Sequence, residues 1–348
     1  MALGNPSRAP HRNPGKTPRG TRRPAVLAPL LAAVLAAGCL TACSDGGNDA
    51  KSTAVTAPAR PPVSAPPPAA ASASAVPAPP LKLKTQDPAG GEGARIGWPT
   101  LRTAGVPAGR RLRPSGPITI RKRGTVIDGL LVRTEINVAA SDVTIRNTHL
   151  IAEGEWGIIQ RKGASNLRVE NTEINGDGKR KAQFGILNQG GMLTVRKVHI
   201  HTVADGIGTD HGLIEDSVIH RLKEFPGDHV ACIASNSGPA PGLSLVIRHN
   251  VALNPLGQTS AVSIYQDFGR AYDTTVEGNL LGGGGYALYG GKGKFGVSSN
   301  IRILRNVFSR SVYKNGGYFG PVTAFEPRGR GNVWKGNVWS DTGRPVLP

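Results

Sequence analysis

The sequence predicts an all-β fold: a single-domain right-handed parallel β-helix of about eight to ten coils with an N-terminal cap, over residues 92–348. Two observations predict it. A pattern of alternating apolar residues followed by a polar turn recurs eight times, and no run between the copies has helical apolar spacing long enough for a crossover helix. Strands that recur roughly every 20 to 30 residues without helices favour a coil in which each strand stacks on its predecessor.

Each copy of the repeat has an apolar residue at its centre and a polar turn shortly after it. The intervals between the central residues vary from 19 to 33 residues, so the coils differ in length. A leucine-rich repeat would show more leucine and a stricter period, and a propeller blade would need four strands in a longer unit. The eight central residues are Ile145, Val169, Val195, Ile214, Ile247, Val276, Ile303 and Trp334.

A second set of short strands lies between these copies, so each coil should contain at least two strands. Each member has an apolar residue flanked by small or polar ones, which is typical of a half-buried strand. We expect the central residues to stack as one inward column: Ile158, Ile186, Ile207, Ile233, Ile264, Leu288 and Phe325.

The turn of the first repeat carries asparagine in most copies. It stands at Asn147 and Asn171 in early copies and one place further along in later ones, at Asn250, Asn279 and Asn306. Stacked side-chain amides can bond to the backbone and to one another, so we expect a structural asparagine ladder.

Residues 1–43 have the layout of a lipoprotein-type signal peptide. A basic stretch without acidic residues precedes the Ala/Leu-rich run 25–40, which is shorter than the roughly 20 apolar residues of a membrane span. The run ends in Leu40-Thr41-Ala42-Cys43, which resembles a bacterial lipobox. We therefore expect an extracellular protein anchored to the cell membrane through a lipid on Cys43. An ordinary secretory signal and a lipobox at Cys39 are the alternatives, and Sec or Tat export stays open.

Residues 44–91 are rich in Pro, Ala and Ser and should form a disordered tether, because they offer too little apolar surface to offset the entropy of ordering. The formal net charge of the whole chain is +19. Residues 85–348 keep 32 basic and 21 acidic side chains, a net charge of +11, so the folded part is basic itself. If the chain is cleaved before Cys43, Cys232 has no partner for an internal disulfide, and we expect it to be buried.

Residues 96–348 resemble the right-handed β-helix proteins of the pectin-lyase-like superfamily, in a branch of exported bacterial proteins. The resemblance rests on the strand repeats and on Gly97-Trp98-Pro99, which is similar to that branch's N-terminal cap. Late segments such as Gly282–Tyr289 and Gly317–Thr323 are similar to its last coils. The resemblance implies a groove for carbohydrate, in a lyase, a hydrolase, an epimerase or a non-catalytic binding protein.

Several candidate site residues lie beside the second set of strands. Tyr265 and Tyr289, on adjacent rungs about 4.8 Å apart, could present a flat platform to sugar rings. Asp210 and Asp267 should lie two rungs, or about 10 Å, apart, which is too far for a retaining glycosidase and marginal for an inverting one. Asp205 lies on the coil of Asp210 and could supply the missing carboxylate. Solvated turn residues are the plain alternative.

The resemblance also implies a His-x-Asp-Gly-Ile-Gln motif. The matching stretch, His229 to Ala234, keeps His229 and Ile233 but has Ala231, Cys232 and Ala234 where the acid, glycine and glutamine are expected. If the motif is catalytic in relatives, this copy could be impaired, although Asp228 could compensate. No His or Cys spacing matches a known zinc pattern, so no metal ligand is predicted.

A lyase that acts on uronic acids needs a base and a cation that stabilises the enolate-like intermediate. Arg161, Lys223 and Arg248 could supply the positive charge and bind an acidic polymer, and Ca²⁺ is the cofactor that such a lyase could use. Nucleic acid is excluded as a partner, because the sequence lacks aromatic residues interleaved with Lys and Arg.

The sequence therefore predicts a surface-anchored protein that recognises a polysaccharide, with an acidic one favoured. Cleavage by a lyase or a hydrolase, with Asp205, Asp210, Asp228, His229 and Asp267 as candidate catalytic residues, is left open. The alternative is a non-catalytic cell-wall or adhesion module on the same scaffold.

Overall fold

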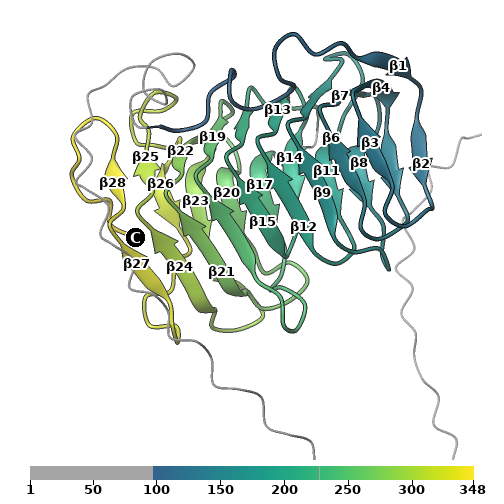
Figure 1. Ribbon diagram of the computed structural model, residues 1–348. Helices are drawn as coiled ribbons and strands as arrows, with labels where there is room; N and C mark the ends of the chain where they lie inside the picture. Colours follow the sequence, from purple (N-terminus) through teal and green to yellow (C-terminus); the bar gives the residue numbers. More distant parts are fainter. Residues whose placement is uncertain (1–96, 227) are drawn as a thin grey trace, which may run out of the picture. The chain divides into compact units, whose positions relative to one another are not determined.

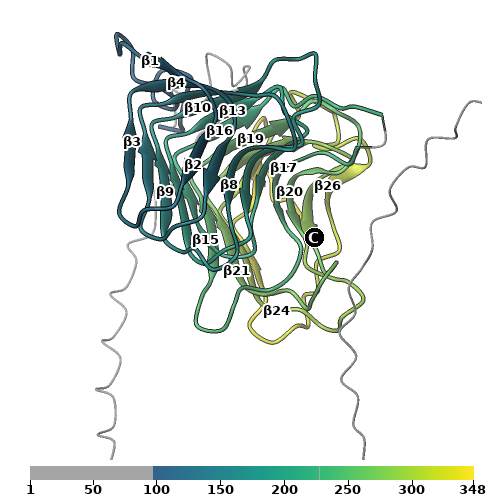
Figure 2. The same cartoon turned by 90° about the vertical axis from the view of Figure 1, so that its right-hand side faces the viewer.

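The computed structural model describes residues 97–226 and 228–348, which are all-β and contain no helix (Figure 1). The predicted signal peptide, the tether and Cys43 lie outside the described residues. Within these ranges, no helix is long and apolar enough to cross a membrane. The strands form three sheets in which every neighbouring pair is parallel, so the predicted parallel β-helix is confirmed. Figure 2 looks along the stack of coils.

Each coil contributes one strand to each sheet, and we name the sheets A, B and C. Sheet A has ten strands: β1 (Arg113–Ser115), β4 (Leu130–Thr134), β7 (His149–Ala152), β10 (Glu173–Gly176), β13 (His199–His201), β16 (Val218–His220), β19 (Val251–Asn254), β22 (Leu280–Gly283), β25 (Val307–Phe308) and β28 (Val338–Trp339).

Sheet B has nine strands: β2 (Ile118–Ile120), β5 (Ile136–Val138), β8 (Trp156–Gln160), β11 (Phe184–Asn188), β14 (Asp205–Gly208), β17 (Ala231–Ser235), β20 (Ser260–Ile264), β23 (Tyr286–Gly290) and β26 (Gly320–Thr323). Sheet C also has nine: β3 (Val126–Asp128), β6 (Thr144–Arg146), β9 (Leu167–Glu170), β12 (Leu193–Arg196), β15 (Gly212–Glu215), β18 (Leu245–Arg248), β21 (Tyr272–Glu277), β24 (Ser299–Leu304) and β27 (Val333–Lys335).

The inward column of sheet B follows the predicted pairing in its first four members and departs from it later. Ile158, Ile186, Ile207 and Ile233 stack as expected. The next members are Val262 and, after Leu288, Val322 rather than the predicted Ile264 and Phe325. Val262 and Ile264 are two residues apart and both apolar, so alternation alone fits either register.

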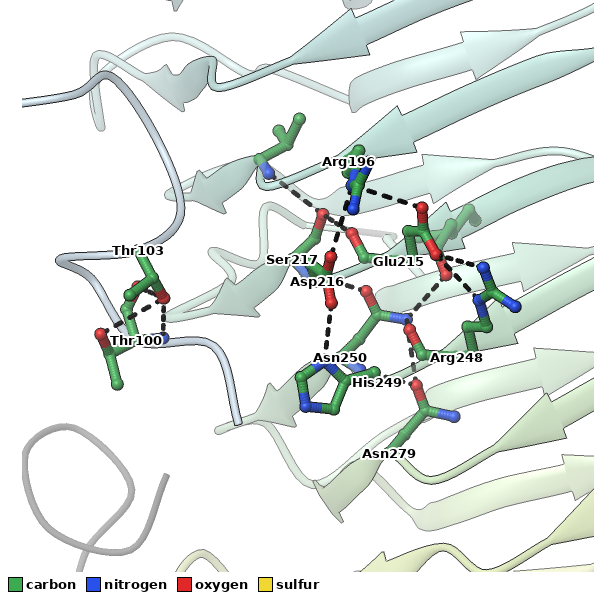
Figure 3. Close-up of polar contacts among 12 residues, drawn as sticks. Thr100, Thr103, Arg196, Glu215, Asp216, Ser217, Arg248, His249, Asn250 and Asn279 are labelled. Carbon is green, nitrogen blue, oxygen red and sulfur yellow. Dashed lines mark hydrogen bonds and ion pairs between the residues drawn. The ribbon is translucent and has the colours of Figure 1, made fainter. Parts of the chain in front are cut away.

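The turn between sheets C and A explains why the asparagine shifts by one place. The first turn position has a left-handed backbone in nearly every coil, with φ of 49° at Asn147 and 45° at Asn171, a conformation that asparagine tolerates well. The next position points into the core. Only the later asparagines occupy it. There Asn250 Nδ2 donates to Asn279 Oδ1 at 3.0 Å (Figure 3), and Asn279 Nδ2 donates to Asn306 Oδ1 at 2.9 Å. The ladder is therefore confirmed for the later coils alone.

The segment of residues 97–105, here called the N-terminal strap, runs across the outer face of sheet A (Figure 1). Trp98 is 6% exposed and packs against an outward row of apolar side chains on four successive strands: Val218, Val251, Leu280 and Val307. Burying such a row removes apolar surface from water. The predicted cap residues therefore cover the side of sheet A rather than the end of the first coil.

Candidate functional site

A groove of about 660 Å³ lies over sheet B, from β11 to the last coils. Its floor is low because the outward positions of two adjacent strands, Gly208 and Ala234, carry almost no side chain. The same outward column has Leu187 before these two positions, and Ser263 and then Tyr289 after them. The hollow therefore follows directly from the residue sizes on successive rungs.

Stacked glycines near the beginnings of three successive strands of sheet B, β8, β11 and β14, set one edge of this groove. Gly157, Gly185 and Gly206 occupy equivalent positions, and a Cβ on Gly206 would lie 2.3 Å from the carbonyl oxygen of Cys232 on the next coil. A side chain would clash at such a distance, so only glycine fits there. The residues just before these glycines are Trp156, Phe184 and Asp205, which pair in register on neighbouring strands.

At this edge of the groove, Asp205 is a carboxyl group whose pKa is shifted from its ordinary value. It is 8% exposed and lines the groove, where its carboxylate accepts hydrogen bonds from the backbone N–H of Ala231 (2.9 Å) and from Gln183 Nε2 (2.8 Å). Burial raises the pKa of Asp205 to about 6, against the lowering effect of these two hydrogen bonds, and the neighbouring Asp228 raises it further. Such a carboxyl can hold or release a proton near neutral pH.

Asp228, Lys181 and His229 surround Asp205. Asp228 is buried, forms an ion pair with Lys181 and accepts a hydrogen bond from the backbone N–H of Phe225 at 3.0 Å. His229 is exposed and lines the groove. This edge of the groove therefore gathers two carboxyl groups, an ammonium group and an imidazole, all of them groups that can take part in acid–base chemistry.

Aromatic side chains form the opposite wall. The ring centroids of Tyr265 and Tyr289 lie 5.3 Å apart, but the rings are inclined by 60°, so they make a corner rather than the flat platform that was predicted. Phe319, which is 64% exposed, also lines the groove and packs on Tyr286, with 5.7 Å between the centroids. An angled aromatic wall can still contact the faces of sugar rings.

Asp267 lies at the rim of this wall, far from Asp205. Asp205 begins β14, whereas Asp267 follows the end of β20, which is two rungs further along. Two rungs and the length of a five-residue strand put the start of β14 about 16 Å from the end of β20, and Asp267 lies three residues beyond that end. The two carboxyl groups are therefore too far apart to act as a glycosidase pair.

The other predicted residues lie outside the groove. Asp210 accepts hydrogen bonds from the backbone N–H groups of Asn236 (2.7 Å) and Ser237 (3.1 Å) and thereby fixes a turn. Arg161 donates to Asn137 and lies over the ring of Trp156 at 4.7 Å. Lys223 donates to the carbonyl oxygen of Gly178.

Arg248 lies on sheet C, on another face of the β-helix. It pairs with Glu215 at 2.7 Å, in a surface network that also includes Arg196 and His249 (Figure 3). Arg248 is therefore a surface ion-pair residue and cannot reach a ligand held over sheet B.

A second hollow of about 480 Å³ adjoins the groove and extends it toward the first coils. Phe184 lines both spaces. Trp156, Lys181 and Gln183 also line the second hollow, so its walls carry an aromatic ring, an ammonium group and an amide. Together the two spaces follow the long axis of sheet B over several rungs.

Sequence reasoning missed Lys181 and Gln183 in the loop before β11 and Phe184 at the start of β11. Lys181 and Gln183 contact the carboxyl groups of Asp228 and Asp205, and Phe184 joins the two hollows. A signal was present for Phe184, because Trp156-Gly157-Ile158, Phe184-Gly185-Ile186 and Asp205-Gly206-Ile207 repeat one pattern. No such pattern marks Lys181 or Gln183.

The groove does not fit a calcium site. Ca²⁺ takes several oxygen ligands, many of them carboxylates. Asp205 and Asp267 line the groove from opposite edges, and the one group of three metal-ligating side chains in residues 97–226 and 228–348 lies on sheet A. We therefore derive no chemical step through calcium.

The comparisons with known proteins identify no relative: no protein-family model, no curated protein and no solved structure matches the chain.

Proposed function

We propose that the groove over sheet B binds an extended polysaccharide and that Asp205 acts on it as a general acid or base. The observation that carries this proposal is the position of Asp205, a buried carboxyl with a raised pKa that lines an elongated groove with aromatic walls. A long open groove suits a polymer, whereas a small metabolite is usually enclosed. Membership of the pectin-lyase-like superfamily, an extracellular location and a lipid anchor at Cys43 complete the proposal.

The chemistry of the edge favours an acidic polymer. Lys181 is half-exposed beside the second hollow, and His229 is exposed beside Asp205. Both can donate hydrogen bonds to sugar carboxylates, and Lys181 carries a positive charge. In a lyase reaction, Asp205 would take the proton beside the uronate carboxylate while Lys181 stabilises the developing negative charge. The electron pair would then form the carbon–carbon double bond as the glycosidic C–O bond breaks, and the leaving oxygen would take a proton from water or from the protonated Asp205.

The same residues allow a hydrolase, in which protonated Asp205 would donate its proton to the leaving oxygen. This route needs a second carboxylate at a suitable distance. Asp228 lies beside Asp205 but is buried and paired with Lys181, and among the described residues that line the groove the only other carboxylate is Asp267 at the far rim. The geometry therefore supports a lyase better than a hydrolase.

A screen of acidic and neutral polysaccharides tests the proposal. Unsaturated products, read by ultraviolet absorbance, would report a lyase, and new reducing ends without unsaturation would report a hydrolase. Binding would be measured in parallel by affinity electrophoresis. Neither product nor binding with any polymer would contradict the proposal.

A non-catalytic binding module is the second candidate. The ion pair between Asp228 and Lys181 favours this candidate, because each side chain neutralises the other and both are then less available for acid–base chemistry beside Asp205. Asp205→Asn separates the two candidates. An enzyme would lose turnover and keep its fold, whereas a binder would lose at most some affinity. Asp210 is unsuitable for this test, because its carboxylate fixes the turn at residues 235–237.

A further inference from the structure

The outer face of sheet A carries a second polar cluster that is independent of the groove. Glu173 lies on β10, His199 and His201 lie on β13, and His220 lies on β16. His199 and His201 are two residues apart on one strand, so their side chains leave the same face. Glu173 pairs with His199 in register, and these side chains therefore meet across neighbouring coils.

The distances in this cluster are close to those around a metal ion. Glu173 Oε1 lies 3.2 Å from His201 Nε2 and 3.5 Å from His199 Nδ1. One ligand atom from each of the three residues lies within 4.8 Å of the other two. Ligand atoms around a tetrahedral zinc ion, with bonds of about 2.0–2.1 Å, are about 3.3 Å apart. Small side-chain movements would therefore close the cluster around an ion.

The remaining ring nitrogens already have hydrogen-bond partners. His199 Nε2 lies 3.0 Å from His220 Nε2, and His201 Nδ1 lies 2.9 Å from Thr202 Oγ1. With a metal ion bound, these nitrogens would carry the ring protons, and His199 Nδ1 and His201 Nε2, which now face Glu173 Oε1, would turn their lone pairs to the ion. Hydrogen bonds of this kind orient the histidine ligands of metal sites.

The cluster is partly covered yet open to solvent. The side chains of His199, His201 and Glu173 are 12%, 24% and 30% exposed. The N-terminal strap borders it, because Gly105 donates from its backbone N–H to Lys197 and a Cβ on Gly105 would lie 3.1 Å from His199 Cβ. An ion could therefore enter from solvent without a change in the fold.

We infer that this cluster binds one divalent transition-metal ion of the zinc type through Glu173, His199 and His201. Two imidazoles and one carboxylate favour Zn²⁺ or Co²⁺ over Ca²⁺ or Mg²⁺, which prefer oxygen ligands. Three protein ligands leave a fourth position for water or for an external donor. His220 is a positioning residue that holds the ring of His199.

Titration of the full chain with Zn²⁺, followed by calorimetry, tests this inference. Wild type should bind one more ion than a His199→Asn/His201→Asn variant. The matched control is His249→Asn, which removes a histidine outside the cluster at a position with φ of 52°, where asparagine is well tolerated. It should bind as wild type does. His220→Ala should weaken binding roughly 10- to 100-fold, as loss of such second contacts does elsewhere.

Glu173→Gln keeps the test decisive if the double variant misfolds. It preserves the size of the side chain and should still weaken Zn²⁺ binding. Co²⁺ absorbance adds a second readout: nitrogen and oxygen ligands should give d–d bands without the thiolate charge transfer that Cys39 or Cys43 would cause. The inference would be overturned by equal stoichiometry and affinity in wild type and Glu173→Gln, by spectra of thiolate character alone, or by no bound ion in wild type.

Discussion

The outer faces of sheets A and B are built from the same repeat but meet solvent differently. On sheet A, successive rungs present valine and leucine, and the N-terminal strap covers them with Trp98. On sheet B, successive rungs present Gly208 and Ala234, and a groove stays open between an acidic edge and an aromatic wall. The difference shows that residue size on a single outward column decides whether a face is packed or available to a ligand.

The largest expected effect is on the packed face. Trp98→Ala should lower the free energy of unfolding by about 3–5 kcal/mol, because it removes a large buried side chain and leaves a cavity against Val218 and Val251. Polysaccharide binding in the groove should be unchanged under conditions where the variant is folded. Chemical denaturation and a binding isotherm would check the two expectations. A loss of polysaccharide binding with no loss of stability would show that Trp98 serves ligand binding rather than the packing of sheet A.

The next effect concerns the pH dependence of stability. The pKa of Asp205 is about 6 in the folded protein, above its ordinary value of 3.8, so its contribution to stability is full below pH 3.8 and is lost as the pH rises through about 6. The loss is on the order of 3 kcal/mol, given about 1.36 kcal/mol for each pKa unit. Asp205→Asn should remove this component. Denaturation midpoints of both proteins from pH 4 to 8 would reveal it, and identical pH profiles would refute the assignment.

Filling the floor of the groove should weaken ligand binding with a smaller effect on stability. Ala234→Trp places a large side chain in the hollow and should reduce affinity for the polysaccharide roughly 10- to 100-fold, or about 1.4–2.8 kcal/mol. Leu213→Trp, on the half-buried outer face of sheet C, is the matched control and should bind normally. Equal affinity in all three proteins would place the binding site elsewhere.

The smallest effect is expected for Arg248→Ala. Arg248 pairs with Glu215 on the surface of sheet C, and exposed ion pairs contribute about 0–1 kcal/mol. Both stability and polysaccharide affinity should therefore stay close to those of wild type. A large drop in affinity would show that a ligand contacts sheet C.

The sequence was sufficient for the fold because burial imposes a visible pattern. Ile145 and the other central residues alternate with polar neighbours and recur in every coil, so strands and stacking could be predicted. The register of the later strands in sheet B could not be predicted in the same way. Val262 and Ile264 satisfy alternation equally, and the choice between them depends on contacts with the neighbouring coils, which a local pattern does not contain.

The site could be predicted only in part. Asp205, His229, Tyr265, Asp267 and Tyr289 do line one groove. Asp210 and Arg248 were attractive by residue type, but their partners are turn amides and a neighbouring carboxylate. The stretch at Ala231 and Cys232 lacks the expected acid and glycine, yet Asp205-Gly206-Ile207 supplies them one coil earlier, where the carboxylate of Asp205 accepts a hydrogen bond from the N–H of Ala231.

The most direct test of the central claim is the rate of depolymerisation by wild type and Asp205→Asn, measured on the polysaccharide that the screen identifies. The account predicts that the variant binds the polymer with similar affinity, unfolds at a similar or higher denaturant concentration at pH 8, and loses turnover by at least about 100-fold, the usual contribution of a general acid or base. Undiminished turnover in a folded Asp205→Asn protein would contradict it.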